Sequence, residues 1–336
     1  MKICLVSRYF SFRNAGVGRV GMEIAKELVA RGHTVYTVHT DGGSLYSYFF
    51  YTGFQLPFQL PKADVYHAIT PMEAMWLPKD KSVVTYHDLF QITDPDKLGS
   101  GLGYSKWKNF VGIKYFTLAA NIAKKCAKVT AVSEQTRNDL IKCLNMPEDR
   151  IHVIRSGISL HLQPYNRREK VETIGYLGQL DRRKRVDLLI EAFRRHDSKL
   201  RLLIAGTGAD EVKLMKLASG DKRITFLGRI PDSDLPSFYN HVDAFIFPTW
   251  LEGYGLPIVE AMACNRPVVV LADAKIPDEV KNRCVIVDSL DTLFGNLDYL
   301  EGRCTYNGYE SNCSWAKAHS WKDAVDQYEE LYKELG

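Results

Sequence analysis

The hydrophobic pattern of the chain alternates from end to end between short apolar runs rich in β-branched residues and longer stretches with helical spacing. Such alternation is typical of βαβ units, in which parallel strands are covered by the helices that connect them. We therefore expect an α/β protein built on parallel sheets. The predicted strands cover residues 2–7, 34–40, 64–70, 82–87, 128–133, 151–156, 173–178, 200–206, 224–228, 243–249, 267–272 and 284–289.

Residues 156–172 interrupt this alternation with glycine, proline and a cluster of charges, which is typical of a linker. Since 336 residues can fill two cores, we expect two facing Rossmann-like domains with a cleft between them. The first would span residues 1–158 and include the C-terminal helix 319–336. The second would span residues 159–318. Other helices are predicted at residues 17–31, 104–126 and 134–144.

Composition narrows the class of protein. Apolar residues make up 46% of the chain and charged residues 25%, as in an ordinary globular protein. No apolar run approaches the roughly 18 residues of a membrane-spanning helix, so we expect a cytoplasmic protein. The net charge of +4 is too small to indicate a nucleic-acid partner. Seven scattered cysteines without a CxxC pair argue against a zinc cluster or a disulfide framework.

Residues 16–21, GVGRVG, match the dinucleotide-binding pattern, and Asp41 lies at the end of the following predicted strand. That pattern should follow its strand directly, whereas residues 8–15 intervene here. Nicotinamide binding is therefore the weaker interpretation. Gly16 and Gly18 either let a phosphate or sugar approach the helix N-terminus or only shape a loop, and the motif alone favours neither.

The stretch TWLEGYGLPIVEAMACNRPVVV, residues 249–270, predicts a strand end, a glycine turn and a helix that begins near Pro257. We expect unpaired N–H groups around Gly255, Leu256 and Ile258, which would form an anion site. Asn265 is expected to end the helix in a left-handed conformation.

Two glutamates, Glu252 and Glu260, flank this predicted anion site. Carboxylates accept hydrogen bonds from hydroxyls, so the pair suits a ligand with hydroxyls on both sides of a phosphate, such as a nucleotide sugar. The alternative is a surface glutamate and a helix-start glutamate favoured by the helix dipole. That alternative would be preferred if the motif stood alone.

Further segments connect this motif to a known family. Together they resemble the retaining glycosyltransferases of the GT-B fold, the group 1 or family 4 class with its E-x7-E signature. The matching segments are GYLGQLDRRKRVDLLIEAF (175–193), LLIAGTG (202–208), residues 224–270, TAVSEQTRNDL (130–140) and the C-terminal SWKDAVDQYEELY. The resemblance implies a hexosyltransferase that uses a nucleotide-diphosphate sugar and retains anomeric configuration.

The resemblance assigns roles within the second domain. Glu252 would contact the donor sugar and Glu260 the ribose, and the backbone of Tyr254, Gly255 and Leu256 would lie against the sugar and diphosphate. Lys184 matches the family lysine that neutralises the diphosphate. Loops that contain Gly208 and Arg229 would approach the base.

One position departs from the family pattern. Gln179 stands where the family has an arginine, and an amide lacks a guanidinium's charge and bidentate geometry. We hypothesise that one of Arg182, Arg183 and Arg185 restores this charge, although Arg185 occupies a family glycine position. The alternative for the three arginines is a solvated helix start.

In the first domain, His87 resembles the family histidine that reaches the donor sugar, and Gly16 and Gly18 would lie against the diphosphate. No metal or other cofactor is expected, because the leaving phosphate would accept the acceptor's proton. The expected donor is a UDP- or GDP-sugar, and the acceptor a sugar, glycan or lipid-linked glycan. Two alternatives are a nucleotide-sugar epimerase of similar fold and a catalytically weak sugar-nucleotide-binding subunit.

Residues 104–126 combine lysines with aromatic residues, and residues 98–133 include six lysines and no acidic residue. A basic amphipathic helix docks on anionic lipid, which would place the protein peripherally at the inner membrane face. The alternative, which the sequence favours, is a helix packed on the first domain's sheet with solvated lysines. Donor sugar, acceptor and oligomeric state cannot be assigned from the sequence.

Overall fold

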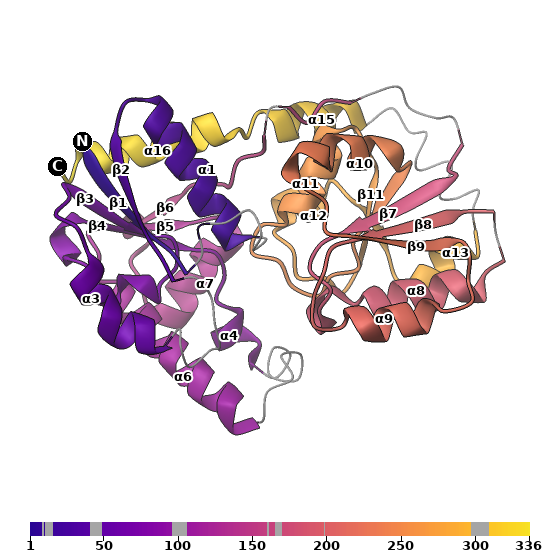
Figure 1. The fold of residues 1–336 in the computed structure, drawn as a ribbon, viewed down its shortest axis with the longest axis horizontal. Helices are drawn as coiled ribbons and strands as arrows, with labels where there is room; N and C mark the ends of the chain where they lie inside the picture. Colours follow the sequence, from indigo (N-terminus) through magenta and orange to yellow (C-terminus); the bar gives the residue numbers. More distant parts are fainter. Residues whose placement is uncertain are drawn as a thin grey trace. The chain divides into compact units, whose positions relative to one another are not determined.

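The protein is described by a computed structural model that covers residues 1–8, 10, 16–40, 49–95, 106–159, 161–164, 170–197, 199–296 and 309–336. It divides into two compact units. Unit 1 comprises Met1–Gly157 and Trp321–Gly336, and unit 2 comprises Ile158–Ser320. Each unit contains its own six-stranded parallel sheet with helices packed against it (Figure 1). The predicted α/β class is confirmed, and each predicted strand overlaps an observed one.

The sheet of unit 1 has the strand order β2-β1-β3-β4-β5-β6. Its strands are β1 (Lys2–Val6), β2 (Thr34–Val38), β3 (Val65–Ala68), β4 (Ser82–Tyr86), β5 (Lys128–Ala131) and β6 (Ile151–Val153). Its helical elements are α1 (Val17–Ala30), η1 (Tyr51–Gln55), α3 (Leu56–Gln59), η2 (Glu73–Trp76), η3 (Lys79–Lys81), α4 (Phe90–Thr93), α6 (Lys106–Ala123), α7 (Glu134–Leu144), η4 (Glu148–Arg150) and α16 (Trp321–Lys333).

The sheet of unit 2 has the order β12-β11-β10-β7-β8-β9. Its strands are β7 (Thr173–Leu177), β8 (Arg201–Ala205), β9 (Ile224–Gly228), β10 (Ala244–Ile246), β11 (Val268–Leu271) and β12 (Val285–Val287). Its helical elements are η5 (Arg182–Lys184), α8 (Val186–Arg195), α9 (Glu211–Ala218), η6 (Asp232–Asp234), α10 (Leu235–His241), α11 (Leu256–Ala263), α12 (Asp278–Lys281), α13 (Leu290–Phe294) and α15 (Tyr309–Lys317).

The strand order of unit 2 reverses between β7 and β10. From β7 the sheet grows outward through β8 and β9 on one side, and through β10, β11 and β12 on the other. The loops that follow β7 and β10 therefore leave the sheet at the same edge and diverge. In open parallel sheets this switch point is where ligands bind.

Helix α16 completes unit 1, although 163 residues of unit 2 separate it from the rest of that unit. Figure 1 shows it, in yellow, beside α1 and near both marked chain ends, and α1 and α16 are in contact. Its buried face holds Trp321, Ala324, Val325, Tyr328, Leu331 and Tyr332. Arg31, which follows α1, pairs with Asp326 at 2.6 Å and Glu329 at 2.7 Å.

A buried polar network joins α16 to the sheet of unit 1. The Nδ1 atom of His67 lies 2.6 Å from the Tyr332 hydroxyl, and its Nε2 atom lies 2.8 Å from Thr85 Oγ1. The Thr85 hydroxyl also lies 3.2 Å from that of Tyr328. His67 is completely buried, and burial is the main cause that lowers its pKa to about 3. The imidazole is therefore neutral in the folded protein at neutral pH.

This network predicts a pH-dependent stability of unit 1. The unfolded chain binds a proton at His67 near pH 6.5, whereas the folded chain resists protonation down to about pH 3, so the free energy of unfolding falls as pH drops through this window. His87, with its pKa lowered to about 4, adds to the same loss. Burial also lowers the pKa of His152 in unit 1, so His67→Gln is expected to remove part of the decrease between pH 6.5 and 4.5, measured by hydrogen exchange in β3, β4 and β5. The exposed His241→Gln is the control, and an unchanged decrease in His67→Gln would contradict the assignment.

Candidate active site

Two buried charged side chains meet at the switch point of unit 2. Lys184 ends the short helix η5 in the loop after β7, and Glu252 lies in the loop after β10. Asp181 begins η5 as its N-cap, because its carboxylate accepts a hydrogen bond from Lys184 N at 3.2 Å. The amino group of Lys184 donates a short hydrogen bond to Glu252 Oε1. Residues 68 positions apart thus form a buried ion pair.

Glu252 Oε1 is surrounded by further donors. Thr249 Oγ1 donates to it at 2.6 Å, and Arg183 Nη1 donates to it at 3.3 Å. Lys184 Nζ also stands 4.8 Å from the centroid of the Phe247 ring, which is a cation–π contact. We call Arg183, Lys184, Thr249 and Glu252 the switch-point cluster. The Asp181 carboxylate lies 4.0 Å from Arg183 Nη2, so its charge and that of Glu252 balance the charges of the two cations.

The environment shifts the pKa of both partners of the ion pair. Burial raises the pKa of Glu252, but Lys184 and Arg183 more than offset this, so its pKa lies below the usual range and it stays ionised. Burial, followed by the nearby charge of Arg183, lowers the pKa of Lys184, while Glu252 raises it. An added anion such as a phosphate would favour the charged form of Lys184. The cluster is therefore suited to receive negative charge.

The backbone around Glu252 is fixed by neighbouring loops. Glu252 N donates to Lys275 O at 2.9 Å, and Lys275 N donates to Trp250 O at 2.8 Å. Trp250 N donates to Arg183 O at 2.9 Å. These bonds tie the loops after β7, β10 and β11 together and hold the carboxylate in place.

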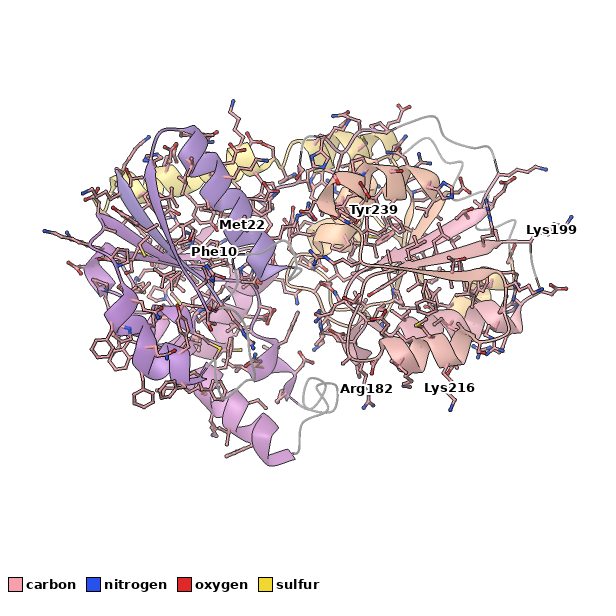
Figure 2. The ribbon with its side chains drawn as sticks, in the orientation of Figure 1. Phe10, Met22, Arg182, Lys199, Lys216 and Tyr239 are labelled. Atoms are coloured by element: carbon pink, nitrogen blue, oxygen red, sulfur yellow. The ribbon has the colours of Figure 1, made fainter. Side chains whose placement is uncertain are left out.

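Arg185 has a different environment from Arg183. Its guanidinium forms two hydrogen bonds with Asp273, at 2.7 and 2.8 Å. It also donates to Pro248 O at 2.7 Å and Thr249 O at 2.9 Å. The backbone of Arg185 is left-handed, with φ of 51°, a conformation that suits the glycine of the family pattern. This arginine connects loops within unit 2. The third arginine, Arg182, is exposed and projects outward in Figure 2.

The predicted anion site at the start of α11 is partly corrected. Gly255 adopts φ of 89° as the N-cap, which permits the turn that precedes Leu256. Ile258 N, however, donates to Gly255 O at 2.9 Å, so the expectation of an unpaired amide at Ile258 is wrong. The first turn of α11 thus contains a 3₁₀-type hydrogen bond between residues three apart, which is common at helix ends. Tyr254 is buried beside this turn, and Asn265 ends the helix with φ of 55°, as expected.

The second glutamate of the motif, Glu260, is buried within α11 and accepts a hydrogen bond from the Tyr239 hydroxyl at 2.8 Å. Tyr239, which is labelled in Figure 2, belongs to α10 of the same unit. The two glutamates thus have different partners: Glu252 joins the cations after β7, and Glu260 joins α10.

Close backbone packing joins the loops that follow β7 and β8. A Cβ atom at Gly206 would lie well inside van der Waals distance of Gly178 O, and one at Gly208 would overlap Leu180 O. Leu180 N donates to Thr207 O at 3.0 Å, and Gly178 N donates to Ala205 O at 3.1 Å. Gly208 therefore lets the loops after β7 and β8 pack closely. This packing fixes the exposed Gln179 beside residues 206–208. Arg229, after β9, is exposed.

The remaining predicted site residues, His87, Gly16 and Gly18, lie in unit 1. His87 follows β4, and its Nε2 atom donates to Ile69 O at 3.0 Å, so Nδ1 is the acceptor of the neutral ring. Gly16 is the N-cap of α1 with φ of 77°, and Gly18 is buried in its first turn. The loop before α1 follows β1, at the switch point between β1 and β3.

Several contributors to the site were not predicted from the sequence. Thr249 and Asp181 contact Glu252 and Lys184 directly, and Asp273 engages Arg185. Asp181 carries a recognisable signal, since an aspartate three residues before Lys184 is a common N-cap arrangement. Asp273 carries none, because it lies 88 positions from its partner.

The described residues lack two kinds of feature. Within the ranges that the structure covers, no group of three or more His, Cys, Asp or Glu side chains is arranged to hold a metal ion. Among the helices of the same ranges, none has the length and apolar character needed to cross a membrane.

Comparison with known families covers both units. Residues 159–289 match the family described as "Glycosyl transferases group 1", and residues 42–162 match "Glycosyltransferase Family 4". The O-antigen chain mannosyltransferase B of Escherichia coli is 26% identical over 280 residues, which are 76% of this chain and 71% of that protein.

Solved structures share the fold over nearly the whole chain. A sucrose-phosphate synthase from Thermosynechococcus elongatus matches with a TM-score of 0.75 and 17% identity, over 99% of this chain and 98% of that one. Anabaena Alr3699/HepE, in complex with UDP and glucose, matches with a TM-score of 0.71 and 17% identity, over 99% and 100% of the two chains.

Proposed function

Because the chain belongs to the group 1, or family 4, glycosyltransferases of the GT-B fold, we propose that it transfers a hexose, mannose being the first candidate, from a UDP- or GDP-sugar to a glycan hydroxyl. The bond between the sugar's anomeric carbon and the diphosphate breaks, and a bond to the acceptor oxygen forms with retention of configuration. Mannose is preferred because an O-antigen chain mannosyltransferase is among the relatives matched over most of both chains.

The observation that carries the proposal is the buried switch-point cluster in unit 2. A diphosphate that departs from a sugar gains negative charge, and preorganised cations in a desolvated site stabilise that charge. Lys184 and Arg183 provide two cations within hydrogen-bond distance of Glu252. The amides at the start of α11 and its dipole add a further positive potential.

Glu252 has two proposed roles in this reaction. Its carboxylate orients Lys184 and Arg183 before the substrate arrives, and it accepts hydrogen bonds from hydroxyls of the donor sugar. Glu260, held by Tyr239, is proposed to bind the ribose, with the Tyr254–Leu256 backbone against the diphosphate. In unit 1, the neutral His87 is proposed to accept a hydrogen bond from the substrate through Nδ1, and Gly16 and Gly18 to approach its phosphates.

The arginine that compensates for Gln179 is proposed to be Arg183. Asp273 and two carbonyls engage Arg185, whereas Arg183 donates to Leu251 O at 2.7 Å and to Glu252, beside Lys184 in the switch-point cluster. Gly208 and the exposed Arg229 stay candidates for contacts to the base through the loops after β8 and β9. In this proposal Arg185 positions the loop that carries Glu252 and does not touch the diphosphate.

This division of roles predicts different kinetic effects. Arg183→Gln is expected to raise KM for the donor about 10-fold, since a charge-assisted bond to phosphate is lost, and to lower the free energy of unfolding by about 1 kcal/mol, since its bond to Leu251 O is lost as well. Adding Gln179→Arg to that variant is expected to recover most of the affinity. Arg185→Gln is expected to lower the free energy of unfolding of unit 2 by about 1–2 kcal/mol, because its hydrogen bonds to charged and backbone groups are lost. Steady-state kinetics and thermal unfolding of the variants check both results. Equal KM values for Arg183→Gln and the natural chain would rule out the assignment.

The proposed function is tested by a panel of UDP- and GDP-linked hexoses, each with an O-antigen-type oligosaccharide acceptor. Release of the nucleoside diphosphate is measured together with the mass of the acceptor. We expect one donor to give stoichiometric release and a hexose-sized mass increase. Conversion of the sugar without release would instead support an epimerase, and binding of a donor without turnover would support a binding subunit.

A further inference from the structure

Four large aromatic side chains project from one flank of unit 1. Phe50, Phe54, Phe58 and Trp76 have exposed fractions of 56%, 67%, 90% and 50%. We call them the aromatic ridge. The rings of Phe50 and Phe54 lie 5.5 Å apart, and the three phenylalanines recur every four residues, at the N-cap of η1, in η1 and in α3. Apolar side chains gathered in this way mark interaction surfaces.

The ridge is the outer face of a well-anchored segment. On its inner face Tyr51, Thr52 and Leu56 are buried, and Tyr51 and Leu56 belong to the core of unit 1. Trp76 Nε1 donates to Thr52 O at 2.8 Å, which fixes the indole beside the segment. The core therefore accounts for the inward residues of this segment but not for the exposed aromatic ones.

Neighbouring helix α6 contributes positive charge. The Tyr115 hydroxyl of α6 lies 2.7 Å from Thr52 Oγ1, and its ring lies 4.3 Å from that of Phe49. Next to Tyr115 on α6, the exposed Lys114 stands 5.5 Å from the ring of the exposed Phe110. Residues 42–61 contain no charged side chain, and residues 98–133 contain six lysines and no acid.

Most of α6 is occupied by packing within unit 1. Phe116, Ala119, Ala120 and Ala123 are buried in its core, and Ala120 O accepts a hydrogen bond from the Tyr86 hydroxyl. Among the side chains that the structure describes, the larger exposed aromatic surface thus belongs to residues 50–58 and Trp76, whereas the sequence indicated the range 104–126, of which the side chains of residues 104–109 lie outside the description. Lys114 of α6 borders this surface with positive charge.

We propose that the aromatic ridge is a docking surface for an anionic lipid bilayer, into whose interface Phe54 and Phe58 insert while Lys114 of α6 meets the headgroups. Aromatic rings partition into the bilayer interface, and nearby lysines add attraction to anionic lipid. A second copy of the chain fits less well, because two ridges of projecting rings leave gaps when they meet face to face. The proposal does not depend on the catalytic function.

The test is co-sedimentation of the full chain with vesicles at low salt. Vesicles of phosphatidylglycerol and phosphatidylcholine in equal parts are compared with phosphatidylcholine alone. We expect binding to the anionic vesicles only, and at least a 10-fold lower partition coefficient for Phe54→Ser with Phe58→Ser. Lys114→Glu should weaken binding by a smaller factor. The matched control is Val212→Ser with Met215→Ser, two exposed apolar residues of α9 in unit 2, and should bind like the natural chain.

Circular dichroism melting checks that the ridge variant is folded, which is expected because both phenylalanines are exposed. The proposal is overturned if the natural chain fails to bind anionic vesicles. It is equally overturned if the ridge variant binds these vesicles as strongly as the natural chain. It is also overturned if light scattering shows a dimer that the ridge variant dissociates, because the surface would then join two copies. Since no donor or acceptor is present, these outcomes are independent of the transfer reaction.

Discussion

Replacing Lys184 with methionine is expected to lower kcat/KM for the nucleotide sugar by about 100- to 1,000-fold, which is typical for the loss of one preorganised charge in an active site. The side chain is buried and pairs with Glu252, so methionine fills the space but removes the cation that we propose to stabilise the departing diphosphate. The same change also leaves the buried negative charge of Glu252 without its Lys184 partner. Stability should therefore fall by about 3 kcal/mol.

A second substitution separates the two effects. Glu252→Gln in the Lys184→Met background removes the buried negative charge, and is expected to restore most of the lost free energy of unfolding while activity stays low. Diphosphate release gives the activity, and hydrogen exchange in β7 and β10 gives the stability of unit 2. If the double variant regained activity together with stability, Lys184 would have only a structural role.

Gly206→Ala is expected to destabilise unit 2 by about 4 kcal/mol or to prevent its folding. A methyl group at this position would collide with Gly178 O, and φ of 124° is unfavourable for a side chain. Because Gly178 O belongs to the backbone and the backbone fixes the position of a Cβ atom, relief would require the loops after β7 and β8 to separate. That movement would also displace Gln179 from its present position.

Gly220→Ala is the matched control for Gly206→Ala. Gly220 has φ of 87°, but no atom lies within 4 Å of the position that a Cβ would take, so the substitution carries the conformational cost without the collision. It should cost about 1 kcal/mol, the usual penalty of a left-handed residue. Thermal unfolding of both variants measures the difference. Similar melting temperatures would show that the close approach at Gly206 adds nothing to stability.

The strands were predictable because their signal is local. Each apolar run, such as residues 267–272, is bounded by polar or turn residues and corresponds to an observed strand. Helix α7 was predicted at its observed bounds, since Ser133 caps its start and Asn145 its end. The family was recognisable from the E-x7-E motif and its flanking segments, and the comparisons confirm it.

The side-chain partners within the site were not predictable to the same extent. The sequence placed Arg183 and Arg185 in one basic run, but only the folded structure separates their roles, because Arg185 pairs with Asp273 whereas Arg183 pairs with Glu252. The aromatic ridge was also missed. Its segment lacks an alternating polar face and contains Gly53 and Pro57, so its pattern does not read as a helix.

The return of α16 to unit 1 has a consequence for biosynthesis. Unit 2 is continuous in sequence, so its core can close once residue 320 has left the ribosome. Unit 1 still lacks the helix that covers His67 at that time, and its sheet must wait for residues 321–336. Nascent unit 1 therefore carries an uncovered apolar surface while 163 further residues are translated, which makes it the part of the chain most dependent on chaperones.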